Sequence, residues 1–123
     1  MSEEAALLLD RPDNGLIAPA NCLAEVANTL RKKVVTGDLT RAELLDSLVL
    51  ASTTLDLLPL EPLVDEAAEF ALDNDCTVYD ALYAVLALQR GCLFITADER
   101  LARGLNSRGV FGVLSLRELS AQR

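Results

Sequence analysis

A chain of 123 residues, of which 51% are hydrophobic, has room for one domain with a proper core, so we expect a single domain over residues 1–123. The sequence contains no histidine, which excludes Ser-His-Asp and Cys-His catalysis, histidine general bases and most zinc hydrolases. The net charge of −8 by itself disfavours a nucleic acid partner, although a metal ion held by an acidic cluster would invert the local field.

Membrane, export and disulfide signals are weak in this sequence. The longest apolar stretch, Ala81–Leu88, is too short to span a bilayer, so we expect no membrane association. The acidic opening over residues 1–4 does not resemble an export signal, and a cytoplasmic location is the default expectation. Three cysteines far apart, Cys22, Cys76 and Cys92, predict buried free thiols instead of disulfides or a zinc site.

Turn signals and hydrophobic periodicity divide the first half of the chain into four elements. A dense turn signal covers residues 10–15. In chain order, we predict a short helix over Glu3–Leu9, a buried strand over Leu16–Ala18, a helix over Asn21–Val35, and a helix from the capping box Thr40-Arg-Ala-Glu43 to about Ala51.

The second half alternates strands and helices. The predicted elements are a strand over Leu55–Leu60, a helix from Pro62 to about Asn74, a buried helix over Val78–Gln89 capped by Thr77, a strand over Cys92–Ile95, a helix over Glu99–Ser107, a strand over Val110–Leu114, and a helical turn over Leu116–Ala121. This alternation predicts an α/β fold with a mostly parallel sheet.

Two aspartates stand where helices begin. Asp80 is the only charge between Val78 and Leu88, and charges are seldom buried without a partner. Asp98 follows an apolar strand, and open α/β sheets bind ligands at the carboxyl ends of their strands. Taken singly, each is better explained by helix capping, because Thr77-x-x-Asp80 has capping-box spacing and Asp98 occupies an N-cap position.

Glu25 is a third acid beside an apolar run. It lies on the helical face opposite the apolar stripe, in the company of Asn21 and Asn28. A solvated surface glutamate is the simplest interpretation. The same polar face is also suited to the wall of a cleft.

Three segments in order resemble a known family: Leu-Ala-Glu25-Val-Ala-Asn28, Val-Tyr-Asp80-Ala-Leu-Tyr83, and Gly-Cys-Leu-Phe-Ile-Thr96-Ala-Asp98-Glu-Arg-Leu101. With the Thr-Gly-Asp-Leu-Thr stretch between the first two, the chain resembles PIN-domain proteins, in particular the VapC-like bacterial toxins, over residues 2–120.

The resemblance implies a PIN-like three-layer fold and a metal-dependent endoribonuclease. It implies that Glu25, Asp80 and Asp98 surround Mg²⁺ or Mn²⁺, that the Thr96 hydroxyl lies beside them, and that Asn28 supports the site or the substrate. Hard oxygen ligands suit such an ion, which activates water and stabilises charge on the phosphate during hydrolysis. The implied partners are RNA as substrate, a VapB-like antitoxin, and a second copy in a homodimer.

The chain departs from the family at its front. Family members begin with a hydrophobic strand that carries a further Asp and lies centrally in the sheet, and no such strand precedes residues 2–4 here. We therefore expect a domain truncated at its N-terminus, without the usual first strand and its acid, in which the open position in the sheet closes or is covered by a second subunit.

Three functions remain open at this point. The first is a ribonuclease weakened by loss of the first acid. The second is a catalytically inactive PIN-like protein that serves as a binding or dimerisation module. The third is an α/β protein of unrelated function.

Overall fold

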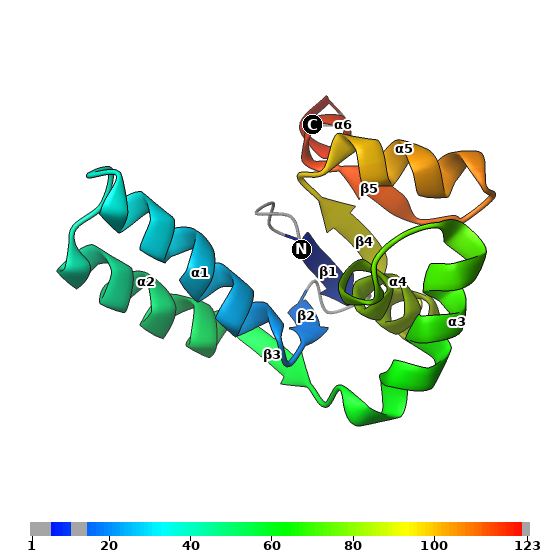
Figure 1. The fold of residues 1–123 in the computed structure, drawn as a ribbon, viewed down its shortest axis with the longest axis horizontal. Coiled ribbons are helices and arrows are strands. Elements are labelled where there is room, and N and C mark those ends of the chain that lie inside the picture. The colour runs from blue at the N-terminus through cyan, green and yellow to red at the C-terminus, as the bar shows by residue number, and fades with distance from the viewer. Residues whose placement is uncertain (1–5, 11–14, 122–123) are drawn as a thin grey trace.

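A five-stranded sheet forms the centre of the fold (Figure 1). In the computed structural model, which describes residues 6–10 and 15–121, the strands are β1 (Ala6–Asp10), β2 (Gly15–Pro19), β3 (Leu55–Leu58), β4 (Leu93–Thr96) and β5 (Val113–Ser115), in the spatial order β3-β2-β1-β4-β5. The predicted α/β class is confirmed.

Strand direction in the sheet is mostly parallel, as predicted. β2 pairs with β3 and β4 pairs with β5 in parallel, whereas β1 is antiparallel to both of its neighbours, β2 and β4. The strands β2, β3, β4 and β5 therefore all run in the same direction. Only the central strand of the described sheet is reversed.

The predicted helix over Glu3–Leu9 is wrong where the structure describes it, because Ala6–Asp10 form β1. Alanine and leucine favour a helix locally, but this segment fills the central position between β2 and β4. Left empty, that position would expose the backbone groups of two strands, at about 1–3 kcal/mol for each buried group without a partner. The open position that we expected is thus filled by the chain's own segment.

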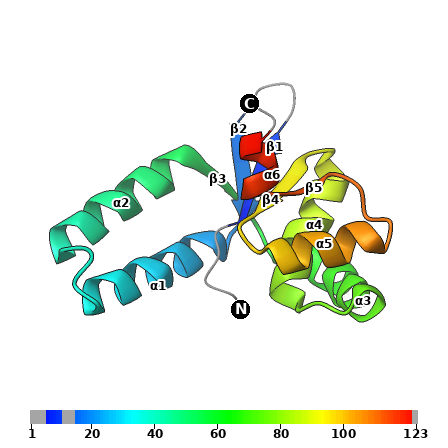
Figure 2. The ribbon, with the colours of Figure 1, turned by 90° about the horizontal axis from the view of Figure 1, so that it is seen from above.

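Two helices form a hairpin that projects from the sheet (Figures 1 and 2). They are α1 (Cys22–Val35) and α2 (Arg41–Thr54). The predicted capping box opens α2: the Thr40 hydroxyl accepts from the Glu43 N–H at 3.1 Å, and the Glu43 carboxylate accepts from the Thr40 N–H at 3.0 Å. No residue of α2 is buried, so this hairpin adds little to the core.

The core lies where α4 (Val78–Arg90) packs against β1, β2 and β4. Every residue from Ala81 to Ala87 is buried, which confirms the prediction for this helix. A short 3-10 turn (Glu61–Leu63) leads into α3 (Val64–Asn74), and α3 packs on α4. None of the helices among the described residues is both long enough and apolar enough to cross a membrane.

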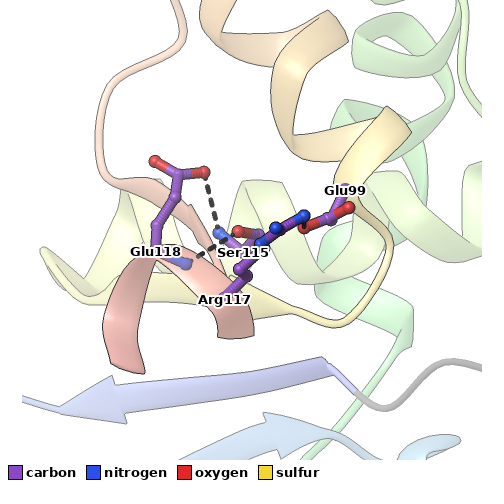
Figure 3. Close-up of polar contacts among 4 residues, drawn as sticks. All are labelled: Glu99, Ser115, Arg117 and Glu118. Carbon is purple, nitrogen blue, oxygen red and sulfur yellow. Dashed lines mark hydrogen bonds and ion pairs between the residues drawn. The ribbon is translucent and has the colours of Figure 1, made fainter. Parts of the chain in front are cut away.

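The C-terminal part adds α5 (Glu99–Ser107), β5 and α6 (Leu116–Ala121). A second capping box opens α6, as Figure 3 shows: the Ser115 hydroxyl accepts from the Glu118 N–H at 3.0 Å, and the Glu118 carboxylate accepts from the Ser115 N–H at 3.2 Å. Beside it, Arg117 lies 3.7 Å from the Glu99 carboxylate on α5. The capping box joins the end of β5 to α6, and the ion pair joins α6 to the start of α5.

Candidate functional site

Asp80 and Asp98 line the same open pocket, although they come from different elements. Asp80 lies in the first turn of α4, and Asp98 lies in the connection from β4 to α5. The pocket has a volume of about 510 Å³, and residues 74–80 form one part of its lining while residues 98–108 form the other. Both carboxylates are half-buried, so they are partly dehydrated but still open to a ligand.

Thr96 and Asp98 form a small hydrogen-bonded turn after β4. The Thr96 hydroxyl accepts from the Asp98 N–H at 3.0 Å, and the Asp98 Oδ1 accepts from the Leu101 N–H at 3.0 Å. The capping interpretation of Asp98 is therefore confirmed. Since only one oxygen of Asp98 caps the helix through this bond, the capping function does not exclude a second function for this carboxylate.

Thr77 caps the helix that carries Asp80. Its hydroxyl accepts from the Asp80 N–H at 3.1 Å. This bond fixes the backbone of the first turn of α4 and with it the position at which the Asp80 side chain enters the pocket. A carboxylate there is also stabilised by the positive end of the helix dipole.

Glu25 is half-buried beside α4 and is held at both carboxylate oxygens. Asn21 Nδ2 donates to Oε1 at 2.7 Å, and the Tyr83 hydroxyl donates to Oε2 at 2.8 Å. Burial raises the pKa of Glu25 above its ordinary value, the two hydrogen bonds oppose that shift, and the negative charge of Asp80 adds to it. The electrostatic coupling to Asp80 relates Glu25 to the pocket, although Glu25 is not among the residues that line it.

Asn28, the fifth residue predicted for the site, is exposed on α1. Its Oδ1 accepts a hydrogen bond of 3.3 Å from Arg31 Nε. It is one turn beyond Glu25 on the same helix, and it does not line the pocket of Asp80 and Asp98.

Tyr83 and Cys22 lie beside Glu25, and neither was predicted as a site residue. Tyr83 is buried, stacks on Phe94 with 5.9 Å between ring centroids, and also shares a hydrogen bond with the Cys22 thiol. A buried phenol needs a polar partner, so a tyrosine one turn after Asp80 on an otherwise apolar helix was the available signal. Burial raises the pKa of Tyr83 and of Cys22, so both remain protonated at neutral pH.

Similarity to known proteins assigns the family. The family model described as PIN domain matches residues 1–104. The chain belongs to the PIN-domain family. No curated protein matches the sequence, but the crystal structure of PAE2754 from Pyrobaculum aerophilum is similar, with a TM-score of 0.67 and 23% sequence identity over 88% of this chain and 69% of that one.

Membership of the PIN-domain family indicates a nuclease-type function, and PIN domains generally use divalent metal ions. Among residues 6–10 and 15–121, no three His, Cys, Asp or Glu side chains form a group able to hold a metal ion. The donor type nevertheless fits, because Mg²⁺ is commonly held by one or two carboxylates together with water and substrate phosphate oxygens. Asp80 and Asp98, which line one pocket, are carboxylates of this donor type.

The register of the sheet places the backbone of Asp10, the acid at the end of β1, away from the Thr96 end of β4. β1 is antiparallel to β4, with Ala6 opposite Thr96 and Leu9 opposite Leu93, while Asp10 is opposite Gly15 at the start of β2. The backbone of Asp10 therefore lies at the opposite end of β1, about 13 Å along the strand from Ala6.

Proposed function

We propose that this PIN domain is an endoribonuclease of the VapC-like toxin type that depends on Mg²⁺ or Mn²⁺. The observation that carries the proposal is the convergence of Asp80 and Asp98, from two different elements, in one open pocket at the start of α4 and α5. Two half-buried hard carboxylates at helix N-termini are suited to a hard divalent cation and its waters.

In this proposal Asp80 and Asp98 hold the metal ion, and Glu25 is the third ligand. When bound, the ion supplies an activated water and stabilises negative charge on the phosphate. Thr96 positions Asp98 through the hydrogen bond to its N–H, and Asn28 supports the substrate from the exposed face of α1.

Asn21 and Tyr83 each donate one hydrogen bond to Glu25, one to each carboxylate oxygen. A carboxylate oxygen accepts more than one interaction, so these donors can orient Glu25 while a cation binds. Burial raises the pKa of Glu25 by making its charged form unfavourable, and a cation bound beside it would offset that penalty.

Calorimetric titration with Mn²⁺, together with cleavage of a single-stranded RNA, tests the proposal. We expect Asp98→Asn to abolish both the binding heat and cleavage while it keeps the fold, because asparagine caps helices as well as aspartate does. Asp73→Asn on the exposed side of α3 is the matched control and should behave as the parent does. Identical heats from the parent and Asp98→Asn would refute the metal site.

A catalytically inactive PIN-like binding module is the second candidate. It is favoured by the hydrogen bonds that hold Glu25 and by the lack of a three-residue metal group within the described residues. Under this alternative the protein binds RNA or a protein partner without Mn²⁺-dependent cleavage. A VapB-like antitoxin and homodimer formation belong to the first proposal, and sedimentation analysis would test the dimer.

A further inference from the structure

One face of α5 carries two arginines towards the pocket of Asp80 and Asp98. Arg100 and Gly104 are one turn apart on α5, and Arg108, four residues after Gly104, is the C-cap residue that ends the helix on the same side as the pocket. All three line the same pocket as the two aspartates. With a rise of 1.5 Å per residue, the Cα atoms of the two arginines are about 12 Å apart along the helix axis.

Acidic and basic side chains both line this pocket, and most of them come from different segments of the chain. Asp75 follows α3 and Asp80 lies in the first turn of α4, whereas Arg100 lies on α5 and Arg108 is the residue that directly follows α5. Both arginines are exposed, and Arg108 Nη1 donates to the Asp73 carbonyl oxygen at 3.1 Å, which uses one of the five N–H donors of its guanidinium group. The two guanidinium groups therefore keep hydrogen-bonding capacity for an anion.

Gly104 separates the two arginines and is not required by packing. A Cβ atom added there would meet nothing within 4 Å, and glycine costs a helix interior about 1 kcal/mol relative to alanine. Its effect is to leave the surface of α5 bare between the two guanidinium groups. A ligand can therefore approach the helix backbone closely at this point.

We propose that Arg100 and Arg108 bind successive phosphate groups of an RNA strand and direct it along α5, past Gly104, to the Asp80–Asp98 pair. The guanidinium fork matches phosphate oxygens in a bidentate manner. On a chain with a net charge of −8, such contacts offset the repulsion between the acidic pocket and the strand. This inference rests on the proposed nuclease function and names the residues that position its substrate.

Fluorescence anisotropy with a labelled single-stranded RNA at several salt concentrations tests the inference, in Mg²⁺ and with Asp98→Asn as the background. We expect Arg100→Gln and Arg108→Gln each to weaken binding and to lower the slope of log affinity against log salt by about 0.7, the value for one phosphate contact on a single strand. Arg103→Gln is the control, because it removes the same charge from α5 but lines a different pocket, with Glu99 and Arg117.

Arg108 also joins α5 to α3, so Arg108→Lys is included to separate charge from folding. It should retain most of the salt slope that Arg108→Gln loses. In the nuclease itself, Arg100→Gln should raise KM more than it lowers kcat.

The outcomes separate this inference from the proposed function. If the parent cleaves RNA and the Arg100→Gln/Arg108→Gln double variant does so with an unchanged KM and salt slope, the inference is wrong while the nuclease function stands. If the parent neither binds nor cleaves RNA, both are wrong. Binding of an acidic peptide in place of RNA, with the same loss in the double variant, would also overturn the inference.

Discussion

The hydroxyl of Tyr83 on α4 donates a hydrogen bond of 2.8 Å to Oε2 of Glu25 on α1, between residues 58 positions apart in the sequence. Tyr83 is itself fixed by burial and by its stacking on Phe94 of β4. One buried phenol therefore positions Glu25 against the helix that presents Asp80. The bond holds the base of the projecting helical hairpin at the site.

Tyr83→Phe should destabilise the fold. The substitution keeps the buried ring but removes the donor to Glu25, and loss of a hydrogen bond to a half-buried carboxylate costs about 1–3 kcal/mol. Urea unfolding at pH 7 measures the change in the free energy of unfolding. Tyr79→Phe is the matched control, since Tyr79 is 55% exposed and should change stability by less than about 0.5 kcal/mol. Equal effects from the two substitutions would contradict this role of Tyr83.

The raised pKa of Glu25 predicts a dependence of stability on pH. A carboxyl group whose pKa is higher in the folded than in the unfolded state favours folding when it is protonated, so its contribution is lost as the pH rises from the ordinary value through the raised one. The stability of Glu25→Gln relative to the parent should therefore increase across that interval. Thermal unfolding from pH 4 upwards measures the difference.

The stability of Glu25→Gln in the presence of Mn²⁺ tests whether Glu25 is a metal ligand. If Glu25 is a metal ligand, the ion stabilises the parent at neutral pH and narrows its difference from Glu25→Gln, because only the parent offers an anionic oxygen there. A difference that Mn²⁺ leaves unchanged would remove Glu25 from the ligand set. Glu43→Gln is not a suitable control, because hydrogen bonds in its capping box lower the pKa of Glu43.

Local sequence signals predicted most helices and strands but not the path of the N-terminal segment. The capping box at Thr40, the Thr77 cap, the glycine after α4 and the apolar run of β4 are local signals, and the structure contains each of these features. The run Ala6–Leu9 is helical by propensity, and only its two partners in the sheet decide otherwise. The last strand is also shorter than predicted, because β5 begins only at Val113.

In the candidate site, too, the features set by local sequence could be predicted, and those set by tertiary packing could not. The turn at Asp98 and the cap before Asp80 could be predicted from spacing alone, whereas the family resemblance implied that the two aspartates lie together. The contact of Tyr83 with Glu25 depends on how α1 packs near α4, which no local pattern specifies. Arg100, Gly104 and Arg108 are each four residues apart in the sequence, but only the structure shows that all three line the pocket of Asp80 and Asp98.

Ser115→Ala should weaken the C-terminal region. Ser115 is buried, and its hydroxyl caps α6 by accepting from the Glu118 N–H (Figure 3). Loss of an N-cap costs about 1 kcal/mol, which urea unfolding resolves. Ser107→Ala removes an exposed hydroxyl that only donates to the Gly104 carbonyl in the last turn of α5, so it should have little effect. A smaller loss for Ser115→Ala than for Ser107→Ala would show that this cap does not contribute as the structure indicates.

Thr96→Val tests whether Mn²⁺ binding requires the hydrogen bond by which Thr96 positions Asp98. Valine has nearly the same shape in this buried position, but it leaves the Asp98 N–H without its hydroxyl acceptor, at about 1–3 kcal/mol. Because Asp98 then loses a fixed backbone position, we expect Mn²⁺ affinity to fall even at temperatures where the variant is fully folded. Thr96→Ser loses a methyl group but keeps the acceptor, so it should be somewhat less stable than the parent and bind Mn²⁺ normally. Calorimetric titration of the two variants with Mn²⁺ separates these effects. A loss of Mn²⁺ affinity in both variants would show that packing around β4 causes the loss. Unchanged Mn²⁺ affinity in both would mean that the Thr96 hydroxyl supports only the fold.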